Sequence, residues 1–167
     1  RRGAAARRGA PRQRGGVAVK PKKTEIEAVL LCWVSVNHRS GPVVTAIRDP
    51  DGALSGRVRR LYLCWRDAPP PEGDRERDAV RDTVAELREQ LGSDCPEIVK
   101  LPWKTTESPT AHAAIRPFAE AALLRVRDDN PEAIVVIHLS PGTPAMHAVW
   151  LTLGSTGFLS GQVRLIQ

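Results

Sequence analysis

The sequence has few cysteines and no long apolar run, and both shortages narrow the class of protein. Cys32, Cys64 and Cys95 are odd in number, far apart and without CxxC spacing, which indicates reduced core residues rather than disulfides. No segment approaches the roughly 18 uninterrupted apolar residues that a membrane helix needs. The basic N-terminus lacks the apolar core of a secretory signal. We therefore expect a cytoplasmic protein with no contact to the membrane.

Acidic residues are missing from the first 23 positions, which carry nine Lys or Arg. The rest of the chain holds 16 basic and 19 acidic residues, so the net charge of +6 comes from this tail. Its Arg/Gly/Ala/Pro composition cannot form a core, and we expect residues 1–24 to be disordered. Two interpretations stay open. The tail could contact nucleic acid through phosphate charge, or it could be an extension without function, including a start-site artefact.

From residue 25 onward, β-branched and aromatic runs alternate with segments of helical spacing. This alternation predicts βαβ units and a parallel sheet of five or more strands, covered by helices on both faces. Right-handed crossovers make a doubly wound, Rossmann-like α/β topology the simplest solution. The predicted strands are 26–36, 58–65, 97–103, 132–139 and 161–167, and the predicted helices are 76–91, 107–126 and 143–157, with a short helix or loop over 43–56.

Three further expectations concern the ends of these elements. Ser108 is predicted to cap the helix over 107–126, and Pro117 is predicted to kink or split it. Residues 25–167 are expected to form one domain. Because a strand is an unusual last element for such a sheet, we expect this domain to be the N-terminal part of a longer protein.

In a doubly wound sheet the first and fourth strands often lie side by side, and a crevice opens beyond their carboxyl ends. After the fourth strand, Thr143 can cap a helix, Pro144 suits its first position, and Gly142 permits a close approach or a positive φ. The free N–H groups and the helix dipole there favour a phosphate. Ser140 adds a hydroxyl group. Ordinary helix capping is the alternative interpretation of this loop.

The loop after the first strand offers Asn37, His38 and Arg39. An Asn side chain can read a base edge or a ribose, and an Arg can pair with phosphate. A solvated turn is the alternative, because Asn is a turn former and all three side chains tolerate water.

Several motifs are absent. No GxGxxG follows the first strand, no Lys lies in the 140–144 loop, and no GxSxG is present, so the sequence predicts no NAD site, no Walker P-loop and no serine hydrolase. The four histidines lack HxxxH spacing, so we expect no metal and no cofactor. His138 is expected to be a hydrogen-bonded core residue. For His112 and Trp103, a ligand contact and simple packing both stay open.

One motif carries a family resemblance. Residues 137–159, with Ser-Pro-Gly-Thr-Pro between a strand and a helix, resemble the second ligand motif of CARF domains, the CRISPR-associated Rossmann-fold sensors. Residues 41–65 and 108–115 resemble two looser segments of one branch of that family. This branch lies at the front of bacterial enhancer-dependent, sigma-54-type transcriptional activators such as the RNA-repair operon regulator. The resemblance covers about residues 27–167.

The resemblance implies a homodimer that binds a cyclic oligoadenylate, or an RNA end with a 2′,3′-cyclic phosphate, and controls a C-terminal effector or ATPase. Many cyclic-oligoadenylate binders carry Lys or Arg where this chain has Pro144, so the ligand's identity stays open. Two alternatives remain: a ring nuclease that slowly cleaves its cyclic ligand, and a nucleic-acid-binding module driven by the tail. The second motif is matched by Ser140, Gly142, Thr143, Pro144 and Met146, and Asn37, His38 and Arg39 occupy the first-motif position.

Overall fold

The structure, a computed structural model, describes residues 27–49, 54 and 58–167. The basic tail predicted to be disordered lies outside the described residues. Strands and helices alternate along the described part, in the order the sequence predicts. The strands are β1 (Ala28–Trp33), β2 (Val58–Asp67), β3 (Glu97–Lys104), β4 (Ile134–His138) and β5 (Val163–Ile166), and the helices are α1 (Gly41–Arg48), α2 (Asp74–Leu91), α3 (His112–Asp129) and α4 (Pro144–Ser155), with a 3-10 turn at Gly92–Asp94.

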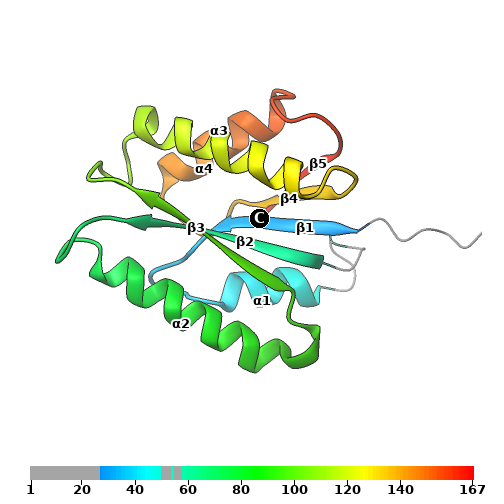
Figure 1. Cartoon of the computed structure of the whole chain (residues 1–167), viewed down its shortest axis with the longest axis horizontal. Coiled ribbons are helices and arrows are strands. Elements are labelled where there is room, and N and C mark those ends of the chain that lie inside the picture. The colour runs from blue at the N-terminus through cyan, green and yellow to red at the C-terminus, as the bar shows by residue number, and fades with distance from the viewer. Residues whose placement is uncertain (1–26, 50–53, 55–57) are drawn as a thin grey trace, which may run out of the picture.

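The five strands form one parallel sheet in the order β3-β2-β1-β4-β5. Helices α1 and α2 cover one face, and α3 and α4 cover the other (Figure 1). The winding direction reverses between β1 and β4, where Leu31 pairs with Ile137. This arrangement confirms the Rossmann-like α/β fold predicted from the alternation of strands and helices.

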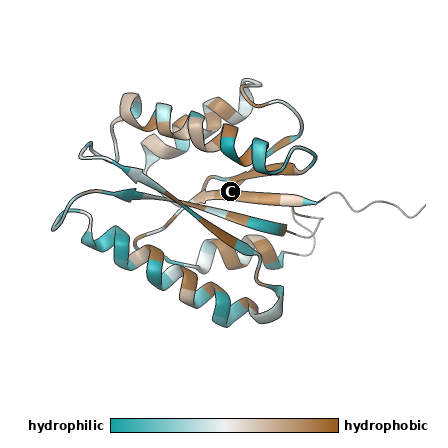
Figure 2. Ribbon diagram, in the orientation of Figure 1, coloured by the Kyte–Doolittle hydropathy of each residue, from teal (hydrophilic) through white to brown (hydrophobic). Residues whose placement is uncertain are grey.

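Strand β1 is buried along its whole length because helices cover both faces of the sheet. Its alternate residues enter two separate cores: Val29, Leu31 and Trp33 pack under α3 and α4. Leu30 and Cys32 pack over α1 and α2. Figure 2 shows the apolar strands at the centre and polar residues on the outer faces of the helices. The continuous apolar run that predicted this strand therefore reflects burial from both sides.

One local prediction about α3 is wrong, and of the kink or split predicted at Pro117, the split does not occur. Ser108 does not cap the helix, because its hydroxyl contacts Thr110 at 2.8 Å within a separate turn, and the helix begins only at His112. Pro117 does not split the helix either. It lies on the exposed face, as does Ala113, whose carbonyl loses its helical donor to the proline and can hydrogen-bond to water instead.

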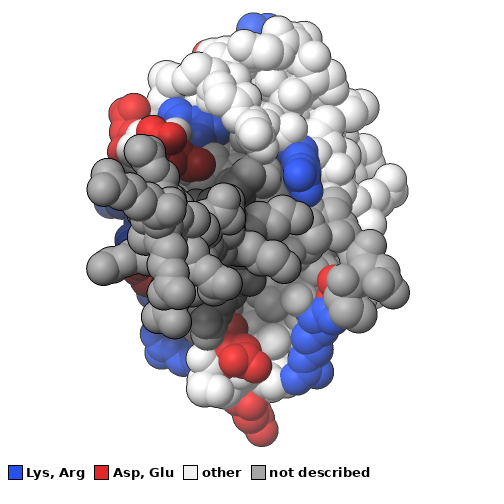
Figure 3. Space-filling view, turned by 90° about the vertical axis from the view of Figure 1, so that its right-hand side faces the viewer, with Lys and Arg blue, Asp and Glu red and all other residues white. Residues whose placement is uncertain are grey.

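The amino ends of the strands carry paired charges. Arg59 lies 2.7 Å from Glu27, and Arg60 lies 2.7 Å from Glu97 across β2 and β3. Figure 3 looks onto this end, and acidic and basic side chains lie beside one another on its visible part. Exposed pairs of this kind contribute little stability. Within the described ranges, no helix is both long and apolar enough to cross a bilayer.

The packing of α3 predicts very different losses of stability when two neighbouring leucines are replaced. Leu123 is fully buried, whereas Leu124 is 50% exposed. Leu123→Ala should lower the free energy of unfolding by about 2–5 kcal/mol, because it removes a buried side chain and leaves a cavity. Leu124→Ala should change it by less than about 1 kcal/mol. Urea denaturation of both variants measures the difference, and equal losses would contradict the packing described here.

Candidate functional site

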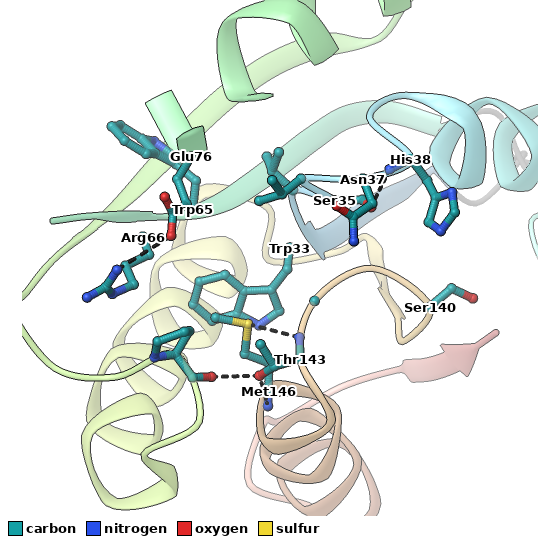
Figure 4. A pocket seen from close by; sticks show the side chains of 14 residues that line it. Trp33, Ser35, Asn37, His38, Trp65, Arg66, Glu76, Ser140, Thr143 and Met146 are labelled. Atoms are coloured by element: carbon teal, nitrogen blue, oxygen red, sulfur yellow. Dashed lines mark hydrogen bonds and ion pairs between the residues drawn. The ribbon is translucent and has the colours of Figure 1, made fainter. Parts of the chain in front are cut away.

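The carboxyl ends of β1 and β4 open on one pocket of about 390 Å³. The loops after the two strands form opposite parts of its wall, as the reversal of winding predicts (Figure 4). The end of β2, the start of α2 and Pro109 complete it. The pocket brings together six of the residues selected from the sequence: Asn37, His38, Ser140, Gly142, Thr143 and Met146.

The first loop is a tight turn organised by Ser35. The Ser35 hydroxyl accepts the His38 amide at 2.9 Å, and the Ser35 carbonyl accepts the Arg39 amide at 3.0 Å. Arg39 completes the turn with a φ of 44°. Asn37 is exposed at the tip, and its side chain points toward the pocket (Figure 4). Asn37 and Ser35 both line the pocket, and Ser35, which organises the turn, was not among the residues selected from the sequence.

The same loop is fastened to α2 through Glu86. The Ser40 hydroxyl donates to the Glu86 carboxylate at 2.7 Å, and this bond is the main reason that the pKa of Glu86 is lowered. The Arg39 guanidinium also pairs with Glu86, at 3.2 Å, and with Asp82, at 3.4 Å. Arg39 does not line the pocket. Its charge is balanced on α2, so the structure does not bring this predicted residue together with the others.

The second loop lies directly on Trp33. Gly142 has a φ of 112°, and a Cβ added there would lie 3.2 Å from both the Trp33 Cβ and the Met146 sulfur. Two features therefore require glycine at this position, as predicted: the positive φ and the lack of room for a Cβ. In Figure 4 the Ser140 hydroxyl points away from Thr143. Ser140 lines this pocket at its edge and a second cavity beyond it.

Thr143 caps α4 as predicted. Its hydroxyl oxygen accepts the Met146 amide at 3.3 Å and donates its proton to the Pro109 carbonyl at 2.6 Å. Pro144 occupies the first helical position and does not line the pocket. The hydrogen bonds of the described residues leave the amides of Gly142 and Ala145 without a protein acceptor. The donors available at this helix end are therefore backbone amides rather than the Thr143 hydroxyl.

The wall also contains residues that the sequence did not select, and Arg66 is the most informative. Its side chain is 3% exposed, it donates to the Glu107 carbonyl at 2.8 Å, and it pairs with Glu76 at 3.5 Å and with Glu72. The pocket therefore has a buried guanidinium whose charge is already balanced. Its position near the carboxyl end of the strand beside β1 is the sequence feature that could have identified Arg66 as a pocket residue. The other unselected lining residues are Trp33, Val34, Ser35, Val36, Trp65, Glu76 and Pro109.

The two residues left open in the sequence lie away from this pocket. Trp103 is 6% exposed and packs edge-on against Trp33, with ring centroids 6.1 Å apart, and against Phe118 at 6.0 Å. Its contacts fit the packing interpretation. His112 is exposed at the start of α3 and lines a mainly apolar groove of about 310 Å³ between α3 and α4, together with Val149 and Leu153.

His138, the last residue of β4, is buried as expected but is not hydrogen-bonded through Nδ1. Burial, with a smaller contribution from His147, lowers the pKa of His138 to about 4. It lines the second cavity, of about 570 Å³, beside Pro42 and Thr45 of α1. In the part of the chain that the structure describes, no group of three His, Cys, Asp or Glu side chains is placed to hold a metal ion.

Fold and pocket together define a Rossmann-like α/β domain with a ligand-sized cavity at its topological switch point. The fold is similar to a solved structure of Enterococcus italicus Csm6 bound to cyclic hexa-2′-fluoro-hexa-dAMP, with a TM-score of 0.61 and 15% sequence identity. The match covers 84% of this chain and 33% of the Csm6 chain, so this chain spans about a third of that protein's length. The likeness supports a CARF-like fold. No protein-family model and no curated protein matches the sequence.

Gly142 provides a test of the packing between the second loop and β1. Gly142→Ala should lower the free energy of unfolding by about 2 kcal/mol or more, because the new Cβ meets Trp33 in a strained backbone conformation. Gly157→Ala is the control, since Gly157 also has a positive φ, 71°, but faces open space. It should cost only about 1 kcal/mol of backbone strain. Thermal or urea denaturation that ranks the two variants the other way would contradict this contact.

His138 makes the stability of the fold depend on pH. Its folded pKa of about 4 lies below the ordinary value of 6.5, so the unfolded chain binds the proton more readily. The free energy of unfolding should therefore fall as the pH drops from about 6.5 to 4, by about 3 kcal/mol at most from this residue. His138→Gln should reduce that slope, whereas His112→Gln, which replaces an exposed histidine, should not. Denaturation curves across this pH range measure both slopes.

Proposed function

We propose that this domain is a ligand sensor, which binds a cyclic oligonucleotide or an RNA-end nucleotide and controls an attached effector or transcription activator. The observation that carries the proposal is the shared pocket at the β1 and β4 exits. Asn37 and the N-terminal turn of α4, with its free amides, both line this pocket. A helix N-terminus suits a phosphate, and an amide side chain suits a ribose or base edge.

The charges around the pocket limit the kind of ligand. Arg39 is paired on α2, and Arg66 is paired with Glu76 and Glu72. A densely charged polyphosphate would have to compete with these carboxylates. A phosphodiester, which brings one negative charge per nucleotide, needs only the dipole and the amides of α4. This balance favours an oligonucleotide or a cyclic phosphate over a nucleoside triphosphate.

The pocket's size favours one nucleotide unit in each copy of the chain. A volume of about 390 Å³ lies near the lower end of the usual range for ligand sites, roughly 300–1,000 Å³. A homodimer would present two such pockets to two units of one symmetric ring. The CARF resemblance of residues 137–159 supports a dimer, and the cyclic ligand bound to Csm6 supports a ring.

Control of an effector requires that the ligand bind two arrangements of the protein with different affinities. In this proposal, ligand capture between the two loops favours one relative placement of the two copies. An effector or a sigma-54-type ATPase domain, in a cytoplasmic protein of which this chain is the sensory part, would respond to that placement.

Calorimetric titration tests the function. The chain should bind at least one of cyclic tri-, tetra- and hexa-adenylate or an RNA with a 2′,3′-cyclic phosphate end. Asn37→Ala and Thr143→Ala should each weaken binding about tenfold. Asn37→Ala removes a hydrogen bond to a charged or buried ligand group, and Thr143→Ala removes the cap that orders the N-terminus of α4. Thr143→Ser keeps the cap and should restore most of the affinity.

Thr152→Ala is the matched control, because it removes the same hydroxyl from an exposed position of the same helix, where it bonds only to the Ala148 carbonyl. Its affinity should equal that of the wild type. If the wild type binds one of these ligands, and Asn37→Ala and Thr143→Ala bind it equally well, the pocket is not the binding site. If none of the ligands binds, the proposed function is wrong.

A further inference from the structure

The first turn of α4 contains an unusual capping box. In the common form, Glu or Gln at the third helical position accepts the amide of the capping residue. Here the third residue is Met146, and its thioether sulfur accepts the Thr143 amide at 3.4 Å. Sulfur is a weak acceptor, and the first turn contains no acidic residue. The Thr143 amide is therefore occupied but poorly satisfied, at the positive end of a helix dipole.

Trp33 brings a second unsatisfied donor to the same wall. Its side chain is 2% exposed and lines the pocket, and its Nε1 has no acceptor among the described residues. A Cβ built on Gly142 would lie 3.3 Å from the Trp33 Cδ1, the ring carbon bonded to Nε1. The same Cβ position lies 3.2 Å from the Met146 sulfur, so the indole edge and the thioether both lie against this glycine. Figure 4 shows the indole, the thioether and the Thr143 turn together. A buried donor without a partner is costly, and a ligand oxygen would remove that cost.

We propose that Met146 is a placeholder, which a phosphate of the ligand displaces from the Thr143 amide, and that the Trp33 indole N–H then becomes a further donor to this phosphate. The inference rests on the proposed function and deepens it. It assigns the phosphate to a specific pair of donors, and Trp33 is a residue that neither sequence motif contains.

The chemistry of the residues makes the exchange favourable. A phosphate oxygen is a charged acceptor, so its hydrogen bonds to N–H groups are stronger than those of a thioether. The Thr143 hydroxyl already donates to Pro109, which leaves the amide as the donor to be shared. Met146 is 5% exposed and packs in the core beside Trp33, so the phosphate must offset the burial that its displacement loses. The unbranched side chain has three rotatable bonds, which give it other rotamers to adopt. A Glu at this position would instead complete the common capping box and occupy the amide permanently.

The chain contains a single methionine, which makes the displacement directly observable. In protein labelled with ¹³C at the methionine methyl group, one NMR signal reports the environment of Met146 beside the Trp33 ring. Titration with cyclic tetra-adenylate, and separately with inorganic phosphate, should move this signal toward that of a solvated methionine. The movement should saturate with the dissociation constant that calorimetry gives for the same compound.

Two pairs of variants test the donors. Met146→Glu should weaken binding about tenfold to a hundredfold, because the carboxylate can occupy the Thr143 amide and repels phosphate. It should also lower the melting temperature, because residue 146 is only 5% exposed and the carboxylate would lie among apolar side chains. Ala85→Glu adds the same charge on the exposed face of α2 and should change neither quantity as strongly. Trp33→Phe should weaken binding about tenfold. Trp150→Phe is its control, because Trp150 is also buried with an unpartnered Nε1 but does not line the pocket.

The outcomes separate this inference from the proposed function. If a nucleotide binds but the methionine signal does not move, or Met146→Glu binds it like the wild type, the placeholder is wrong and the function stands. If no nucleotide binds, but inorganic phosphate moves the signal in the wild type and not in Trp33→Phe, the placeholder stands and the function is wrong. If inorganic phosphate does not move the signal and none of the nucleotides tested by calorimetry binds, both are wrong. Should Trp33→Phe fail to fold, Met146→Glu and the methionine signal still decide.

Discussion

The parallel pairing of β1 with β4 is the constraint on which the rest of the structure depends. The chain winds in opposite directions from these two strands, so the connections that leave them go to opposite faces of the sheet. A crevice therefore opens between their outgoing loops. The registers that pair Leu31 with Ile137 and Cys32 with His138 bring the two strand ends to the same level. The turn at Asn37 and the turn at Gly142 consequently face each other across one pocket.

Trp33 links this pocket to the core beneath it. Its ring contacts Trp103, Phe118 and Trp150, with centroids 5.3–6.2 Å apart, so the floor of the pocket is also the top of an aromatic cluster. Gly142 lies against the same ring. Packing and site geometry are therefore not separable here, because a change that moves the indole also moves the turn at the start of α4.

The sequence predicts those features that depend on local pattern. The apolar run at β1, the Thr143 cap and the glycine conformation at 142 follow from burial on two faces, helix-end chemistry and a positive φ. The partners of charged side chains do not follow from pattern. Arg39 looked like a free cation beside Asn37, but the fold places Glu86 next to it from 47 residues away in the chain.

Residues that line the pocket from β2 and α2 were missed for the same reason. Arg66 and Glu76 belong to the site only because β2 lies beside β1 and because α2 begins near their carboxyl ends. Buried hydrogen bonding is also beyond pattern. His138 has the burial that its strand predicts, yet the environment of its Nδ1 depends on α1 and on the end of β5.

The fastening of the first loop to α2 has a mechanical consequence. Ser40, Arg39 and Gln90 tie the loop and the last turns of that helix into one hydrogen-bonded unit around Glu86. An 18-residue helix is a rigid rod about 27 Å long. The tip carrying Asn37 therefore cannot shift far by itself. A larger shift must either break the hydrogen bonds to Glu86 or move α2 as well. The opposite end of α2 lines the pocket at Glu76.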